Sequence, residues 1–178
     1  MKRIMQLVNE AIEEIEHYGS CEAAYQLLKY ISSAGEKLIK EEEEKYDFTL
    51  DQLVLLSMAR KTKKYKLLAS SFFVYDYLSK KYKVQEPLFT FRWGKLYFIY
   101  SYRIVGRLSL LVEKGFLQIE RRGEIKLTSL GEEESKSLFS MLNQRDKDEI
   151  KKIKEKVEQL TLTELRIYTK KYLFEVAK

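Results

Sequence analysis

The segment from Tyr100 to Leu130 constrains the fold more than any other part of the chain. In its first half, apolar residues have the spacing of one helix face, at Ile104, Val105, Leu108, Leu111 and Val112. Gly115 follows as a helix stop. The next residues alternate between apolar and polar on both sides of Arg121-Arg122-Gly123. The pattern predicts a helix over about 101–114 and an antiparallel hairpin over about 116–127.

The remainder of the chain favours helices. It holds one Pro and seven Gly among 178 residues, beside 24 Lys and 22 Glu. Apolar stripes predict helices from Ile4 to Ile15, from Ala24 to Leu38, from Leu50 to Met58 and from Leu67 to Leu78. Residues 88–93 have the composition of a short strand. We therefore expect a mostly α fold, and the Lys and Glu enrichment indicates a thermophilic source.

Charge is divided unevenly along the chain. Residues 1–60 carry a net charge of −5, residues 61–126 of +10 and residues 127–178 of +1, which together give +6. The basic character (pI near 9.1) thus belongs to the middle third. Such an asymmetry is typical of a surface that docks an anionic partner, although a solvated lysine-rich face would give the same count.

The pattern L-x-x-L-x-x-x-G-[FL]-[LI], a hairpin, and L-T-x-x-G runs from Leu108 through Gly115 to Gly131. It resembles the recognition helix, wing and following helix of winged helix-turn-helix transcriptional regulators of the MarR and PadR groups. The resemblance implies a helix in the DNA major groove and a wing on the backbone or minor groove. Its close part covers about thirty residues, and a looser likeness spans 49–142. The Asp-x-Arg element of MarR wings is absent from residues 120–124.

On this interpretation the residues divide into an N-terminal helical extension (1–47), a winged-helix domain (48–142) and a C-terminal helical pair (143–178). The DNA-binding candidates lie in the basic third. Arg103 and Arg107 lie one turn apart on the polar, exposed face of the expected helix, where guanidinium groups would pair with guanine edges or phosphates. Arg121 and Arg122 lie at the hairpin tip, where a wing touches phosphate. The lysines of 61–66 either contact the DNA backbone or form a flexible loop. The candidates are Arg103, Arg107, Lys114, Arg121, Arg122, Tyr100, Lys63 and Lys64. For each, an exposed solubilising or packing role is the competing interpretation.

The C-terminal part predicts two amphipathic helices. One carries an apolar stripe in an otherwise Lys/Glu-rich sequence, at Ile150, Ile153, Val157 and Leu160. Thr161 and Glu164 form a capping box for the second helix. The stripe needs a cover, either from this chain or from a second copy. Because DNA regulators commonly read two half-sites as dimers, we expect these four residues to form a homodimer interface.

Several function classes have no support in the sequence. A single cysteine, Cys21, and a single histidine, His17, do not make a zinc site, so no metal or cofactor is expected. No nucleophile elbow, phosphate loop or paired carboxylate marks a catalytic centre. No run approaches the roughly 18 apolar residues of a membrane span. The opening residues also lack the apolar core of a signal peptide, and these features predict a cytoplasmic, non-enzymatic protein.

The function expected is therefore that of a DNA-binding transcriptional regulator whose partner is double-stranded DNA. The first alternative is a protein-interaction module, such as an antitoxin-like or complex-assembly subunit, whose basic middle third binds an acidic protein. The second is a nucleic-acid-processing enzyme. That alternative would need clustered carboxylates for metal, and those of the basic third are widely spaced in the sequence.

Overall fold

The computed structural model describes residues 45–176 continuously, together with positions 8, 11–13, 15–16, 21, 25 and 28–29. The chain divides into two compact units, Met1–Asp47 and Phe48–Lys178. All described positions between 8 and 29 are helical. The rest of the two helices expected there, and His17, lie outside the described residues.

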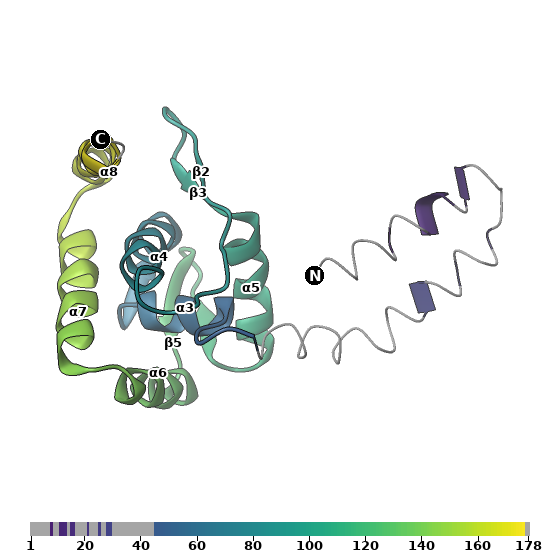
Figure 1. Ribbon diagram of the computed structural model, residues 1–178, viewed down its shortest axis with the longest axis horizontal. Helices are drawn as coiled ribbons and strands as arrows, with labels where there is room; N and C mark the ends of the chain where they lie inside the picture. The colour runs from purple at the N-terminus through teal and green to yellow at the C-terminus, as the bar shows by residue number, and fades with distance from the viewer. Residues whose placement is uncertain are drawn as a thin grey trace. The chain divides into compact units, whose positions relative to one another are not determined.

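The second unit is mostly helical with a small antiparallel sheet, as the composition predicts (Figure 1). Its order is α3 (Leu50–Ser57), β1 (Lys61–Lys63), α4 (Lys64–Leu78), β2 (Thr90–Phe91), β3 (Ile99–Tyr100), α5 (Tyr102–Glu113), β4 (Leu117–Ile119), β5 (Glu124–Leu127), α6 (Ser129–Met141), α7 (Gln144–Gln159) and α8 (Leu162–Val176). Among the described residues, no helix is both long and apolar enough to cross a membrane.

Helix α3 forms the centre of the unit. Every residue from Leu53 to Ser57 is buried, because α4, α5 and α6 each pack against it. The helix begins at a capping box in which the Thr49 hydroxyl accepts from the Gln52 amide and the Gln52 side chain accepts from the Thr49 amide. Apolar side chains from α4, α5, β4, β5 and α6 complete the core around it.

The three-stranded sheet has the order β1-β5-β4, with β5 paired antiparallel to both neighbours. Residues 61–63 alternate with the pleat, so that Thr62 is buried while Lys61 and Lys63 are exposed. The lysine cluster that precedes the long helix in the sequence is therefore not a loop. It forms an edge strand and the first turn of α4.

A 23-residue connection, 79–101, separates α4 from α5 and contains the short β2–β3 hairpin. The strand expected over 88–93 is thus reduced to Thr90–Phe91 and is paired with Ile99–Tyr100. Phe72 of α4 lies edge-to-face against Phe89 and Phe91, with both centroid distances at 5.4 Å. This aromatic cluster attaches the hairpin to α4.

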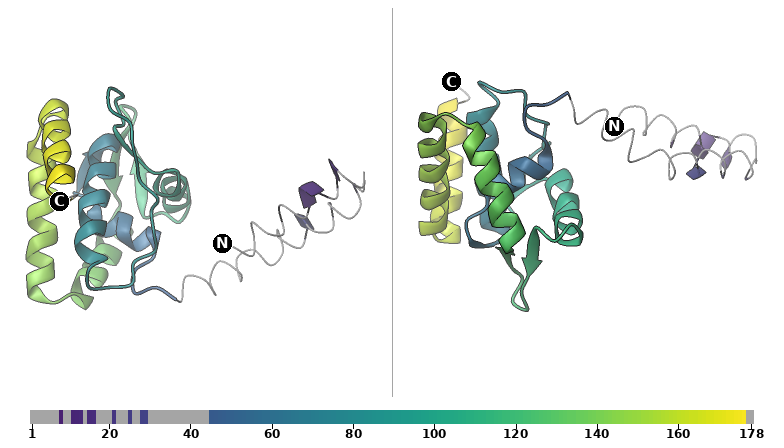
Figure 2. Two further views of the ribbon diagram at one scale, coloured as in Figure 1. Left: turned by 45° about the horizontal axis from the view of Figure 1, so that its top comes forward. Right: turned by 90° about the horizontal axis from the view of Figure 1, so that it is seen from below.

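Helices α7 and α8 both pack against α4 (Figure 2). Ile150 and Val157 are fully buried within the chain, and Ile153 and Leu160 pack against the same core clusters. Ile150 and Val157 therefore have no surface left for a second copy, and the expected dimer interface is corrected at these two positions. Their stripe is covered by α4, with α8 closing over its C-terminal end, so the two helices belong to the same unit as residues 48–142.

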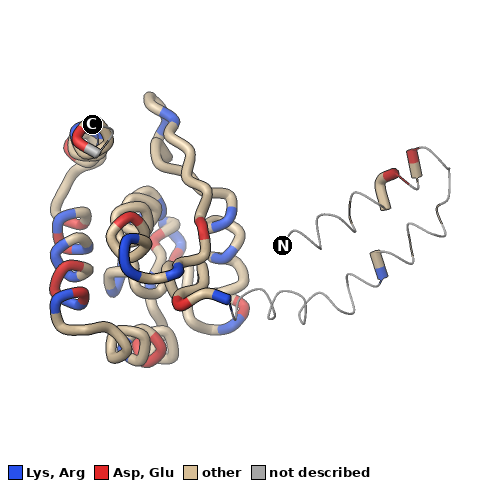
Figure 3. Tube along the Cα trace, viewed as in Figure 1, with Lys and Arg blue, Asp and Glu red and all other residues tan. Residues whose placement is uncertain are grey.

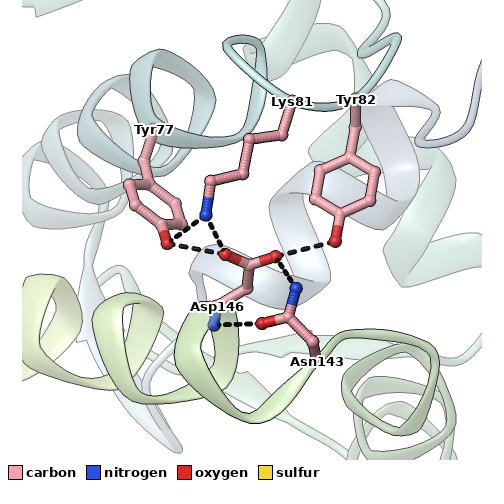
Figure 4. A network of polar contacts seen from close by, with 5 residues as sticks. All are labelled: Tyr77, Lys81, Tyr82, Asn143 and Asp146. Atoms are coloured by element: carbon pink, nitrogen blue, oxygen red, sulfur yellow. Dashed lines mark hydrogen bonds and ion pairs between the residues drawn. The ribbon is translucent and has the colours of Figure 1, made fainter.

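A buried carboxylate fastens α7 to α4 (Figure 4). Asp146 is fully buried and accepts hydrogen bonds from the Tyr77 hydroxyl at 2.6 Å and the Tyr82 hydroxyl at 2.7 Å. Lys81 forms an ion pair with it, and Asn143 Nδ2 donates at 2.7 Å. Burial alone would raise the pKa of Asp146, but these donors outweigh it and lower the pKa to about 2.

We expect Asp146→Asn to lower the free energy of unfolding by about 2 to 4 kcal/mol, because it removes the charge that Lys81 and two hydroxyls were placed to bind. The pKa of Asp146 is depressed in the folded protein, from an ordinary value of 3.8 to about 2. The stabilisation that the Asp146 carboxylate adds to the free energy of unfolding should therefore be complete above about pH 4 and be lost as the pH falls towards 2.

Urea unfolding between pH 2 and 6 measures this contribution. Asp146→Asn should lose less stability than the parent chain between pH 4 and 2. Asp148→Asn, which changes an exposed carboxylate on the same turn of α7, is the matched control and should behave as the parent chain. An equal effect of the two substitutions would contradict the role given to Asp146.

Candidate nucleic-acid interface

Helix α5 begins at Ser101, whose buried hydroxyl accepts from the Ile104 amide at 3.1 Å and donates to the Pro87 carbonyl. It ends before Gly115, which has φ +76°. Ile104, Leu108 and Leu111 are buried, as the apolar spacing predicts. The opposite face of the helix is consequently turned to solvent.

The outward face of α5 is almost uncharged. Its exposed residues are Tyr102, Gly106, Ser109, Leu110, Val112 and Glu113. The expected burial of Val112 on the apolar face is therefore corrected, since this side chain is 37% exposed. Tyr102 is 75% exposed and Leu110 is 42% exposed. A Cβ added to Gly106 would meet nothing within 4 Å, so packing within the described chain does not require glycine there. A glycine inside a helix nevertheless costs roughly 1 kcal/mol relative to alanine.

The arginines expected on this face point elsewhere. The Arg107 side chain is only 14% exposed, and its Nε lies 3.6 Å from Asp51 Oδ1 on α3. Lys114 reaches the other oxygen of Asp51 at 2.8 Å, and Arg103 donates to the Glu86 carbonyl at 2.5 Å. The expected exposure of Arg103 and Arg107 is therefore corrected. They lie at the edge of the helix, where carbonyl and carboxylate acceptors hold them against the rest of the unit.

The β4–β5 hairpin keeps Arg121 and Arg122 exposed at its tip, as expected. Gly123, with φ +71°, allows the tight turn, and its amide donates to the Glu120 carbonyl at 2.8 Å. Lys61 of β1 binds both Glu120 and Glu124 at 2.8 Å. Hydrogen bonds from Lys61 lower the pKa of Glu124, and those to both glutamates raise the pKa of Lys61. Lys61 offsets one of these two carboxylate charges, and with Arg121 and Arg122 the hairpin end carries three cations against two anions, a net charge of +1.

The outer face of the sheet adds positive charge beside the hairpin. In the antiparallel register Lys61 lies opposite Lys126, and Lys63 lies opposite Glu124, so these side chains share one face. Lys63 was expected from the sequence, whereas Lys126 was missed. Its only signal was the alternation in 124–127, where Ile125 and Leu127 point inward.

The remaining candidates make local contacts. Lys64 Nζ lies 5.5 Å from the Tyr97 ring, and Tyr100 stacks with the Arg92 guanidinium at 3.8 Å. Tyr100 also meets Tyr102 edge-to-face at 4.9 Å. Figure 3 shows positive residues along α5 and also along α7, on opposite sides of α4. The structure thus brings Arg121, Arg122 and Lys63 together on the sheet and hairpin but does not join them to Arg107.

The described residues contain no group of three His, Cys, Asp or Glu side chains that could hold a metal ion. Cys21 is exposed. No model of a protein family, no curated protein and no solved structure matches the chain. The interpretation of this surface therefore depends on its own residues and geometry.

Arg107→Ala should lower the free energy of unfolding by about 1 kcal/mol, because Asp51, itself mostly buried, would lose one of its two cationic partners. Arg121→Ala, at the exposed hairpin tip, should change stability by less than about 0.5 kcal/mol. Urea unfolding of the two variants measures the difference. Equal stabilities would place Arg107 in solvent, against the contact with Asp51.

Proposed function

We propose that residues 48–142 form a winged helix-turn-helix that binds duplex DNA, and that the protein is a transcriptional regulator. The order α3-β1-α4-α5-β4-β5 and the sheet order β1-β5-β4 support this assignment. In it α5 is the recognition helix and the β4–β5 hairpin is the wing. The long connection 79–101 is an insertion between the two helices of the turn.

The observation that carries the proposal is the open face of α5 around Gly106. Because packing within the described chain does not require glycine there, its stability cost is explained by a partner that approaches the helix backbone closely. The floor of the major groove is such a partner, since it admits an α-helix and brings base edges against its exposed side. The missing side chain lets the helix seat deeply.

The side chains flanking Gly106 have chemistry suited to base edges. The exposed Tyr102 and Ser109 carry hydroxyls that donate and accept hydrogen bonds, and Leu110 offers an apolar contact to a thymine methyl group. Arg121 and Arg122 supply phosphate contacts from the wing. Recognition of the bases is thus assigned to residues of α5, and binding of the phosphates to residues of the β4–β5 hairpin. This assignment replaces the base-reading roles first expected for Arg103 and Arg107.

A protein-interaction module is the second candidate, and one observation favours it. Val112 and Leu110 are both more than one third exposed on α5, and Glu113 adds a negative charge at its end. An apolar, slightly acidic helix face suits a protein groove as well as DNA. A homodimer also stays a prediction, without the buried Ile150 and Val157 that were first assigned to its interface.

Gly106→Leu tests the helix face. It should weaken binding to a selected duplex by tenfold or more, since the added side chain would hold α5 away from the bases, while leaving the unfolding free energy equal or raised because leucine is the better helix former. Ser137→Leu, on the exposed face of α6, is the matched control and should keep the parent affinity. Fluorescence anisotropy and urea unfolding give both quantities. Unchanged duplex affinity in Gly106→Leu would favour the protein-interaction module.

The wing is tested by salt dependence. Arg121→Ala combined with Arg122→Ala should weaken binding to all duplexes alike and should reduce the slope of log affinity against log salt by about 0.9 for each phosphate that the variant no longer touches. Lys170→Ala with Lys171→Ala removes the same charge from α8 and should leave the slope unchanged. A parent slope near zero would remove the electrostatic basis of the proposal.

A further inference from the structure

A lysine-lined groove of about 410 Å³ lies between α6 and α7. Helix α6 ends and α7 begins at the turn 142–143, and the axes of the two helices point in different directions (Figure 1). Helix α7 lies on the other side of α4 from α5 (Figure 2). The residues that line the groove are Ser135, Lys136, Phe139, Ser140, Lys147, Lys151 and Lys154. It contains four ammonium groups and no carboxylate.

The positions of the lysines follow from helix geometry. Lys147, Lys151 and Lys154 are spaced i, i+4 and i+7 along α7, so they fall on one face. Lys136 faces them from α6. Neighbouring like charges at this spacing destabilise a helix by a few tenths of a kcal/mol per pair. Among the described residues, no carboxylate forms an ion pair with any of the four, whereas Lys152 on the same helix pairs with Glu149 at 2.6 Å.

Lys154 is the most deeply set of the four. Its Nζ lies 4.6 Å from the centroid of the Phe139 ring, at the wall of the groove. Burial, with a smaller contribution from the charge of Lys151, lowers the pKa of Lys154 to about 8. The groove thus holds a partly desolvated ammonium that forms no ion pair with a carboxylate of the described residues, and a bound anion would offset both the burial and the repulsion.

We propose that this groove binds the oligophosphate group of a small phosphorylated molecule. The stretch from Lys147 to Lys154 is about 10 Å long at the rise of an α-helix, which is more than one phosphate group spans. Lysine ammonium groups are compact donors well suited to phosphate oxygens. The proposal does not depend on DNA binding by α5.

A second recess gives room for the rest of such a molecule. It has a volume of about 560 Å³, shares Lys136, Lys151 and Lys154 with the groove, and is lined beyond them by Met58 and Leu127. Glu132, Glu155 and Glu158 also line it. These carboxylates would repel a polyanion that continued through the recess. The combination favours a short phosphorylated molecule over a nucleic-acid strand.

Calorimetric titration with inorganic pyrophosphate at low salt is the direct test. The parent chain should bind saturably with a Kd below about 1 mM. Lys151→Gln and Lys154→Gln should each weaken binding about tenfold, and Lys152→Gln, on the exposed side of α7, should not. Absence of saturable binding up to about 10 mM, or equal effects of the three variants, would overturn the proposal.

Chemical reactivity of Lys154 gives a second readout. At pH 8 its lowered pKa should make Lys154 react faster with trace acetic anhydride than Lys152 does, and pyrophosphate should suppress that advantage. Tighter binding of adenosine diphosphate than of pyrophosphate would assign the second recess to the organic part, and equal binding would assign the site to the phosphates alone. If Lys151→Gln and Lys154→Gln weaken duplex binding while pyrophosphate leaves Lys154 unprotected, the groove serves DNA and the proposal is wrong.

Discussion

The enclosure of α3 is the constraint on which the rest of the unit depends. Leu53, Val54 and Leu56 have no exposed surface, so α4, α5 and α6 must each turn an apolar face towards this short helix. That requirement fixes which side of α5 faces solvent. Asp51 lies in the first turn of α3, and its carboxylate forms ion pairs with Arg107 and Lys114. These ion pairs hold the two side chains off the solvent-facing side of α5. Burial of one eight-residue helix thus decides the chemistry of the candidate interface.

Local patterns in the sequence were sufficient for α5 and for the β4–β5 hairpin. Their apolar periodicity, Gly115 and the turn at Gly123 are read within a few residues of one another. Contacts between distant residues could not be predicted in this way. Asp51 and Arg107 are 56 positions apart, and Asp146 meets Tyr77 from 69 positions away. Hydrophobic periodicity carries no information about such pairs. The sequence therefore predicts an exposed position for Arg103 and Arg107 and does not single out Asp146.

Contacts between distant residues also explain why the sequence predicts neither strand β1 nor the element that covers the α7 stripe. Strand β1 has only three residues and forms because the distant strand β5 pairs with it. Its lysine-rich sequence alone is equally compatible with a loop. The α7 stripe showed that a cover was needed but not which element supplied it. A helix of this kind packs equally well against its own chain or a second copy, and α4 provides the apolar surface here. The Asp146 network then holds the N-terminal end of α7 against the C-terminal end of α4.

The cationic side chains of the unit fall into two groups, those that form ion pairs with carboxylates and those that do not. Lys61, Arg107 and Lys114 form ion pairs with carboxylates. The cations of the hairpin tip and of the α6–α7 groove form no ion pair with a carboxylate of the described residues. The hairpin follows α5, whose exposed face is almost uncharged, whereas α7, which supplies three lysines of the groove, lies on the other side of α4 (Figure 1). We therefore propose two anion-binding surfaces with separate ligands, a duplex on one and a small phosphorylated molecule on the other.

A map of amide chemical-shift changes on addition of a short DNA duplex to isotopically labelled protein tests the central claim most directly. The proposal predicts the largest changes in α5 around Gly106 and at the tip of the β4–β5 hairpin, with α8 unaffected. Changes confined to α7 and α8, or none at low salt, would contradict the assignment of α5 as the helix that reads DNA.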